Sequence, residues 1–427
     1  MPQIKPFRGV LYNTKKIKDL AKVVAPPYDV ISKKQQEDLY RANPYNIVRL
    51  ELGKIKPSDD ATDNRYTRAK RYFESWLADG AMIRDGKEAF YVYSQQYKHS
   101  GKTIERIGFM GLMGVESGDG RKVLPHENTL LAPKVDRLDL MRSVRANLSP
   151  IYVLYDDTQD KVARILKDTC RRTKPFMDIY FEGIRSRTWR LNDPKAIRTI
   201  ERLISKKDIF IADGHHRFEV ARMYSEELSR KGIPENIKEA SRSLMVYFVA
   251  SDKKMLTVLP AHRLPREIGK LTKGEIMKRL EPYFHMRQVS GLKAMMAAIA
   301  RLKDKHAFGV YTGGGKFTVL VLKDVKVSDG VIKDKPKDWK RLDVAILHRF
   351  IFQHVLGIKD SDENIEFVKS PEESSKLVDK GAFKAAFFLN PTEVEQVKRI
   401  AKLGEKMPRK ATYFYPKPIS GAVINKY

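Results

Sequence analysis

Four polar residues fall within one five-residue stretch of the chain: Asp213, His215, His216 and Arg217. The apolar run Ile209–Ala212 before them predicts a buried strand, and the residues that follow predict a helix that begins near His216. A strand-to-helix junction directs backbone N–H groups and the positive end of the helix toward one point, which suits a phosphate or another anion. Gly214 lets the backbone approach a ligand closely, and Arg217 can bind two oxygens at once.

The acidic member of this cluster, Asp213, can hold a metal ion or a hydroxyl group. The alternative for the whole cluster is an aspartate that caps the helix, followed by two histidines without a chemical role. A polar cluster at the mouth of an apolar strand is costly to place there, and this cost favours the functional interpretation.

His126 and Glu127 form a second polar pair, on a loop that follows Pro125. A carboxylate beside a histidine is suited to proton transfer when burial and neighbouring groups adjust its pKa. The alternative is an exposed pair without a role. A helix is predicted over Lys134–Arg145, and three polar residues near its end are candidates for substrate contact: Arg142, Arg145 and Asn147.

Two further residues are candidates for substrate binding because of the segments that carry them. Asp29 lies on a turn framed by Pro26 and Pro27, and its alternative role is to cap its own backbone. His262 lies near the end of the predicted strand Leu256–Leu264, and its alternative is a strand-end side chain that faces water.

The pattern of apolar residues predicts an α+β protein in three parts. Residues 1–87 are an N-terminal segment, residues 88–265 a core that carries both polar clusters, and residues 266–427 a C-terminal α/β unit. No long linker and no internal repeat is visible in the sequence.

Several elements are predicted within these parts. Asn46–Leu52 predicts a strand, and residues 89–113 predict a hairpin that turns at His99–Lys102. Residues 176–191 predict a second hairpin, around Glu182 and Gly183. Residues 342–352 predict an amphipathic helix on which His348 is packed rather than catalytic.

Composition excludes several classes of protein. The 427 residues are 42% hydrophobic and 10% aromatic, as expected of a folded, water-soluble protein. The single cysteine, Cys170, excludes an intrachain disulfide and a cysteine-based zinc site. No apolar run approaches the length of about 18 residues that a membrane span needs, so a cytoplasmic protein without a membrane partner is expected.

The net charge is +29, from 82 basic and 53 acidic residues. A charge of this size is typical of nucleic-acid-binding proteins. The basic residues are spread along the whole chain, however, and form no block of five or six. A lysine-rich surface can reflect the general composition of the host's proteins or anionic small-molecule substrates. We therefore expect a small-molecule substrate, rather than nucleic acid, as the main partner, and the oligomeric state stays open.

Five segments together resemble a family known as domain of unknown function 1015, over nearly the whole chain: Ala25–Ser32, Leu124–Thr129, Arg145–Pro150, Ala212–Arg217 and Thr412–Lys417. This resemblance points to a family and implies no activity.

Two segments, Pro125–Glu127 and Asp213–Arg217, also resemble the ParB/sulfiredoxin-like fold, in particular its free L-serine kinases. This second resemblance implies a ParB/sulfiredoxin-like mixed core over residues 88–265. It implies that Glu127 is the catalytic base, with His126 beside it, and that Asp213 binds Mg²⁺ or positions the serine hydroxyl. It also implies that the transferred phosphoryl group is held by Gly214, His215, His216 and Arg217.

The resemblance further implies ATP, ADP or pyrophosphate as the phosphoryl donor, without selecting among them. This chain departs from those compact kinases, because more than a hundred residues precede Pro125 and about 86 residues separate the two clusters. The resulting prediction is a small-molecule phosphotransferase that converts free L-serine to O-phosphoserine. Two alternatives stay open: a phosphoserine phosphatase that uses the same site, and a ParB-like regulator that binds nucleotide and DNA without catalysis.

Overall fold

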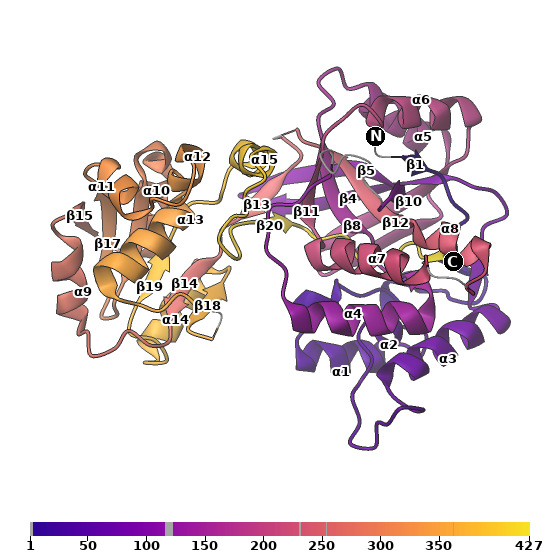
Figure 1. Cartoon of the computed structure of the whole chain (residues 1–427), viewed down its shortest axis with the longest axis horizontal. Coiled ribbons are helices and arrows are strands. Elements are labelled where there is room, and N and C mark those ends of the chain that lie inside the picture. The colour runs from indigo at the N-terminus through magenta and orange to yellow at the C-terminus, as the bar shows by residue number, and fades with distance from the viewer. Residues whose placement is uncertain (1–2, 116–122, 230–231, 253, 362) are drawn as a thin grey trace. The chain divides into compact units, whose positions relative to one another are not determined.

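The structure, a computed structural model, describes residues 3–427 apart from 116–122, 230–231, 253 and 362 (Figure 1). The chain forms two compact units, here called the first unit and the second unit. The first unit comprises Met1–Pro125, Thr129–Thr257 and Pro416–Tyr427, and the second comprises His126–Asn128 and Val258–Tyr415. The predicted N-terminal segment therefore shares a unit with most of the predicted core, and the last residues of the chain belong to the same unit.

A mixed nine-stranded sheet forms the centre of the first unit, in the order β6-β11-β8-β12-β5-β4-β10-β9, with β1 paired to β5. Its strands are β1 (Ile4–Lys5), β4 (Phe90–His99), β5 (Lys102–Gly114), β6 (Val123–Leu124), β8 (Ile151–Tyr155), β9 (Met177–Phe181), β10 (Ile184–Leu191), β11 (Ile209–Asp213) and β12 (Ser243–Ala250). β11 runs parallel to β6, β12 runs parallel to β8, and β11 runs antiparallel to β8. A mixed sheet with helices around it agrees with the predicted α+β class.

Both hairpins predicted in the first unit are confirmed. β4 pairs with β5 across a turn in which Ser100 and Gly101 have positive φ angles of 49° and 75°. β9 pairs with β10 across Glu182 and Gly183, whose φ angles are 50° and 76°. Two-residue turns with positive φ match the right-handed twist of the strands that they join, which explains why these turns could be found in the sequence.

The strand predicted over Asn46–Leu52 is wrong, because Val48–Glu51 form the short helix α2. The side chain of Asn46 accepts a hydrogen bond from the Val48 N–H at 2.9 Å. It also donates to two carbonyl groups of the preceding loop, those of Lys22 and Val24. These local bonds favour a turn of helix over an extended strand. Glu51 consequently lies in the core, with 2% of its surface exposed.

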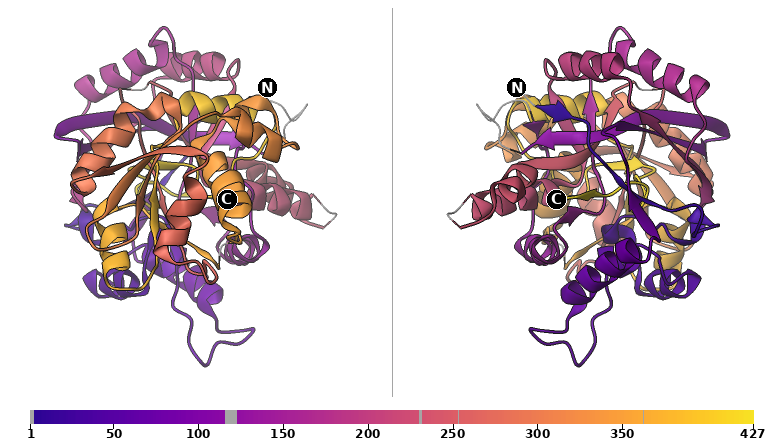
Figure 2. Two further views of the ribbon diagram at one scale, coloured as in Figure 1. Left: turned by 90° about the vertical axis from the view of Figure 1, so that its left-hand side faces the viewer. Right: turned by 90° about the vertical axis from the view of Figure 1, so that its right-hand side faces the viewer.

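Helices α5 (Lys161–Arg172), α6 (Pro194–Ile204) and α7 (His215–Leu228) pack into one apolar core with alternate residues of the sheet, among them Ile151, Val153 and Tyr155 of β8. α4 (Leu131–Val144) packs on α7, and α3 (Arg65–Ala78) packs on α4. The indigo helices of the N-terminal residues lie at the opposite end of this unit from α5 and α6 (Figures 1 and 2). α7 is thus held between the sheet and α4.

The second unit has a six-stranded sheet in the order β15-β17-β16-β19-β14-β18. Its strands are β14 (His262–Pro265), β15 (Phe284–Val289), β16 (Ala307–Tyr311), β17 (Phe317–Leu322), β18 (Ile365–Val368) and β19 (Ala386–Phe388). The pairs between its described strands are all antiparallel. This unit is therefore α+β, and the α/β arrangement predicted for it is wrong.

The helix predicted over residues 342–352 is confirmed in position but differs in geometry. A short helix, α13 (Asp343–Ala345), continues into a π-helix over Ile346–Leu356. His348 on this helix is buried, and its Nδ1 lies 2.8 Å from a carboxylate oxygen of Asp360. Its Nε2 accepts a hydrogen bond from Arg263 Nε at 3.1 Å, so His348 is packed, as predicted.

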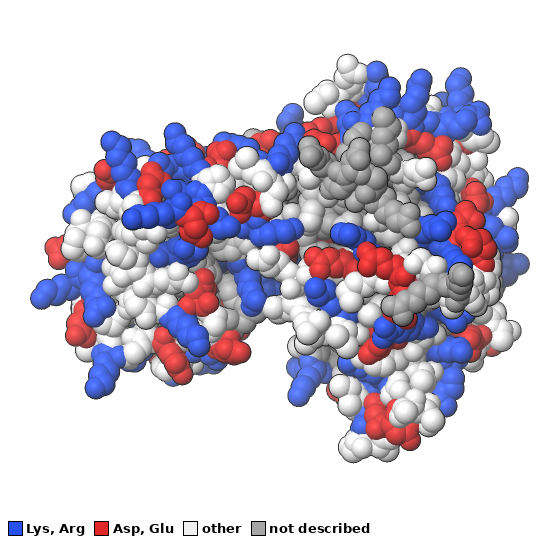
Figure 3. All heavy atoms as spheres, viewed as in Figure 1, with Lys and Arg blue, Asp and Glu red and all other residues white. Residues whose placement is uncertain are grey.

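One face of the molecule shows how its charged side chains are distributed. On the face shown in Figure 3, Lys and Arg side chains occur over both units and alternate with Asp and Glu. In the part of the chain that the structure describes, no helix combines the length and hydropathy that crossing a membrane requires.

Candidate functional site

The predicted strand, turn and helix around Asp213 are confirmed. β11 ends at Asp213, Gly214 is the N-cap, and α7 begins at His215. Gly214 has a φ angle of 93°, and a Cβ atom there would lie 2.8 Å from Cγ2 of Ile151 and 3.0 Å from the guanidinium of Arg217. Only glycine fits this turn without strain, because both the backbone conformation and the space exclude a side chain.

Asp213 bonds two cations, one with each carboxylate oxygen. Its Oδ1 lies 2.5 Å from Nζ of Lys417, and its Oδ2 accepts a hydrogen bond of 2.8 Å from Arg217. Lys417 also forms an ion pair with Asp29, which lies in the 3₁₀ turn Tyr28–Val30. Three segments that are far apart in the sequence therefore meet here within the first unit.

Lys417 is largely enclosed, with 9% of its side chain exposed. Burial disfavours its ammonium form, but the negative charges of Asp213 and Asp29 outweigh burial and raise the pKa of Lys417 above the ordinary value for lysine. Burial also opposes the charge of Arg217, and the charge of Asp213 again prevails, so the pKa of Arg217 is raised as well. Both cations thus stay charged at neutral pH.

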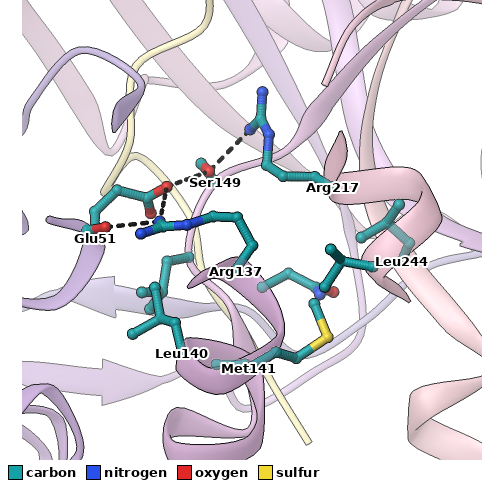
Figure 4. A pocket seen from close by; sticks show the side chains of 11 residues that line it. Glu51, Arg137, Leu140, Met141, Ser149, Arg217 and Leu244 are labelled. Atoms are coloured by element: carbon teal, nitrogen blue, oxygen red, sulfur yellow. Dashed lines mark hydrogen bonds and ion pairs between the residues drawn. The ribbon is translucent and has the colours of Figure 1, made fainter. Parts of the chain in front are cut away.

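Arg217 is buried, and its side chain reaches Ser149 (Figure 4). Its guanidinium donates to Oγ of Ser149 at 2.9 Å and to the carbonyl of Pro150 at 2.7 Å. The Ser149 hydroxyl in turn donates to Oε1 of Glu51 at 3.0 Å. Arg217 therefore links the Asp213 turn to the buried helix α2.

The network continues to Arg137 on α4. Arg137 donates to the backbone carbonyl of Glu51 at 2.7 Å and pairs with Asp136 at 2.6 Å. Its guanidinium also lies over the ring of Tyr28, 4.1 Å from the ring centre. Because Tyr28 precedes Asp29 directly, this contact helps to fix the turn that carries Asp29.

The two histidines of the cluster have different surroundings. His215 is buried, with 3% exposed. His216 accepts a hydrogen bond at its Nε2 from the backbone N–H of Leu130 at 2.9 Å. The next turn of α7 contacts the segment around Leu130 as well, because Glu219 accepts a hydrogen bond from Thr129 and pairs with Lys134.

His126 and Glu127 belong to the second unit, whereas the Asp213 turn belongs to the first. His126 is fully buried, and its Nε2 lies 3.1 Å from Oγ1 of Thr412. Its backbone carbonyl accepts a hydrogen bond from the Met407 N–H at 2.8 Å. Glu127 is half-buried.

Three predicted substrate contacts near the end of α4 have partners within the protein. Arg142 is partly exposed and pairs with Glu227 at 2.6 Å. Arg145 ends α4 with a φ angle of 50°, and its carbonyl accepts a hydrogen bond from the Tyr427 N–H. Asn147 is buried, accepts a hydrogen bond from the Met245 N–H and donates to the Tyr427 hydroxyl. The contacts of Arg145 and Asn147 hold the C-terminal Tyr427 in place.

His262 lies on β14 in the interior of the second unit, with its ring 4.9 Å from that of Phe388. Neither of its ring nitrogens has a hydrogen-bond partner among the described residues. Burial, together with the nearby charge of Arg263, lowers the pKa of His262 to about 3. His262 is therefore neutral at physiological pH.

The surroundings of Asp213 do not fit a magnesium ligand, because both of its oxygens already bond cations. Among the residues that the structure describes, no group of three or more His, Cys, Asp or Glu side chains could hold a metal ion.

Sequence reasoning did not identify Lys417 and Glu51 as members of this network. Lys417 is the last residue of the family-like segment Thr412–Lys417, and its place in that segment was the available signal. Glu51 had no signal, because the segment that carries it, Asn46–Leu52, predicts an ordinary strand.

Residues 4–345 match a family model described as "Protein of unknown function (DUF1015)". No curated protein matches the chain significantly. Among solved structures, the chain is similar to a mutant free serine kinase in complex with AMP, at 13% identity, with 74% of this chain and 90% of that chain covered and a TM-score of 0.37.

Two further solved structures are similar at the same level. A conserved hypothetical protein from Pyrococcus furiosus is 14% identical over 74% of this chain and 93% of that chain, with a TM-score of 0.36. SbnI with a C-terminal truncation, from Staphylococcus aureus, is 10% identical over 73% and 85%, with a TM-score of 0.33. Scores of this size carry no argument about activity, and they leave the ParB/sulfiredoxin-like core a prediction.

Proposed function

The chain belongs to the DUF1015 family, and we propose that it transfers a phosphoryl group to the hydroxyl of a small molecule, with free L-serine as the acceptor. The observation that carries the proposal is the burial of Lys417 between Asp29 and Asp213 at the first turn of α7. The choice of L-serine rests on the resemblance of the segments Pro125–Glu127 and Asp213–Arg217 to the free L-serine kinases.

Phosphoryl transfer depends mainly on positioning the reactants and on stabilising the charge of the transferred group. Two carboxylates fix the ammonium group of Lys417, so it offers a positive charge at a defined point. The N-terminus of α7 adds the partial positive charge of its backbone N–H groups close by. Together these groups suit the oxygens of a phosphoryl group.

The proposal assigns different roles to the remaining residues. Lys417 and the first-turn N–H groups of His215 and His216 bind the phosphoryl group. Arg217 is a positioning residue, because its guanidinium bonds Asp213, Ser149 and Pro150 inside the protein. The role of base that its motif implies for Glu127 stays a prediction, because Glu127 belongs to the second unit.

The donor is a nucleotide, ATP or ADP, or pyrophosphate. At such sites Mg²⁺ commonly binds to the phosphate groups of the donor and to few protein ligands. The proposal therefore does not require Asp213 to bind the metal.

Phosphorus NMR of the purified protein with Mg²⁺ and L-serine tests the proposal, with ATP, ADP and pyrophosphate in separate samples. A phosphoserine signal with one donor is the expected result and identifies the donor at the same time. Release of phosphate from added phosphoserine, without synthesis from any donor, would replace the kinase proposal by the phosphatase alternative. The absence of both reactions would refute phosphoryl transfer on serine.

A further inference from the structure

A small cavity lies beside Glu51 in the first unit (Figure 4). Its volume is about 40 Å³, and every residue that lines it is buried. One wall is apolar and is formed by Leu140, Met141, Val220 and Leu244. The other wall is polar and carries Glu51 together with Ser149, Arg137 and Arg217.

One carboxylate oxygen of Glu51 is unsatisfied. Oε1 accepts the hydrogen bond from Ser149 and lies 3.8 Å from the Arg137 guanidinium. Oε2 is buried and has no hydrogen-bond partner in the described part of the chain. A buried carboxylate oxygen without a partner costs considerable free energy, so its position beside a cavity favours a ligand that can donate a hydrogen bond to it.

The two arginines that line the cavity are already satisfied by other acids. Arg137 pairs with Asp136, and Arg217 pairs with Asp213. The atom left over is thus a hydrogen-bond acceptor, and a positively charged donor would form the strongest hydrogen bond with it. An anion would need an unsatisfied hydrogen-bond donor, and these two arginine side chains, which are paired with other acids, do not offer one.

We propose that this cavity binds a small primary alkylammonium group. The ammonium end donates to Oε2 of Glu51, and the alkyl end packs against Leu140, Met141, Val220 and Leu244. A hard metal cation does not fit, because such ions take about six or more oxygen ligands and the polar wall offers chiefly a carboxylate and a hydroxyl. This binding does not depend on the proposed phosphoryl transfer.

Isothermal titration calorimetry of the full chain with methylammonium chloride, at constant ionic strength and without phosphoryl donor, tests the proposal. We expect saturable binding to the unmodified protein that is at least about tenfold weaker in Glu51→Gln, since the charge-assisted hydrogen bond is lost. Gln keeps the shape of Glu and an oxygen that can accept from Ser149, so the fold should persist. Glu74→Gln, at an exposed side chain, is the matched control and should bind like the unmodified protein.

A second variant, Ala146→Val, fills the cavity from its lining while leaving Glu51 intact, and it should also weaken binding. Equal affinities of the unmodified protein and both cavity variants would overturn the proposal. Absence of saturable binding to the unmodified protein would mean that the cavity holds water only, and would overturn it as well. Saturation of the same site by potassium chloride would overturn the assignment to alkylammonium ions.

Discussion

At the scale of single residues, the candidate site is a network of charged side chains whose positions are restricted by their ion pairs. Lys417 bonds two carboxylates, and Asp213 bonds two cations. Each of these side chains is held by at least two partners, so the charges are fixed before any ligand arrives. Charges fixed in advance stabilise a transition state without the cost of reorganisation.

His262 differs from these well-paired residues, because it is a buried histidine whose ring nitrogens lack partners among the described residues. Its pKa is about 3 in the folded protein and about 6.5 in the unfolded chain. Between these values the unfolded chain binds a proton that the folded protein does not, so stability falls as the pH is lowered, by about 1.4 kcal/mol per pH unit.

The substitution His262→Leu should therefore reduce the loss of folding stability between pH 6 and pH 4, a range that lies between these two pKa values. At pH 7 the variant should be as stable as the unmodified protein or more so, because an unsatisfied buried polar group is removed. Urea denaturation over this pH range measures both effects, with the exposed His285→Leu as control. An unchanged pH dependence in His262→Leu would contradict the argument.

At the scale of elements, the turn from β11 into α7 is the part of the site that the sequence could predict. An apolar strand, a glycine and the start of an amphipathic helix lie next to one another in the chain, so local chemistry specifies the turn. The hairpins at Ser100–Gly101 and Glu182–Gly183 were predictable for the same reason.

Elements that depend on distant contacts were not predictable. The helix α2 forms where Asn46 bonds the loop that contains Lys22 and Val24, and nothing in the local pattern reveals that loop. Lys417 reaches Asp213 from the end of the chain, and the π-helix over Ile346–Leu356 has the same apolar pattern as an α-helix. Long-range packing decides each of these cases.

Gly214, in the turn between β11 and α7, allows a test of the structure at the scale of elements. Gly214→Ala should lower the free energy of unfolding by at least about 2 kcal/mol, because alanine is strained at a φ angle of 93° and its Cβ would meet Ile151. Gly274→Ala, in the helix α9 (Lys273–Leu280) with open space around it, is the control and should be neutral or stabilising. Thermal or urea denaturation compares the two, and equal effects would contradict the structure of the turn.

At the scale of the whole molecule, the last residues of the chain complete the first unit. Residues 416–427 carry Lys417 and four buried apolar side chains: Ile419, Ala422, Val423 and Ile424. They also bond distant segments, since Ser420 exchanges backbone hydrogen bonds with Ala25, and Ile424 with Val10. The net charge, by contrast, is dispersed on the visible face and favours no extended nucleic-acid surface there (Figure 3).

Truncation after Tyr415 should therefore destabilise the first unit and leave the second folded. Burial of each large aliphatic side chain contributes about 1.5–3 kcal/mol, so the loss should amount to several kcal/mol in total. Amide hydrogen exchange of the truncated chain should show reduced protection in β8, β11 and β12, with β16 and β17 unchanged. Equal protection of both units before and after truncation would contradict this division of the chain.

The role of Lys417 in phosphoryl transfer is tested by phosphoserine formation by Lys417→Met, compared with the unmodified protein and with the exposed control Lys70→Met. We expect a loss of kcat/KM of about 100-fold or more in Lys417→Met, because the fixed positive charge that faces the phosphoryl group is removed, while Lys70→Met keeps full activity. Full activity in a folded Lys417→Met, or no phosphoserine from the unmodified protein with ATP, ADP or pyrophosphate, would contradict it.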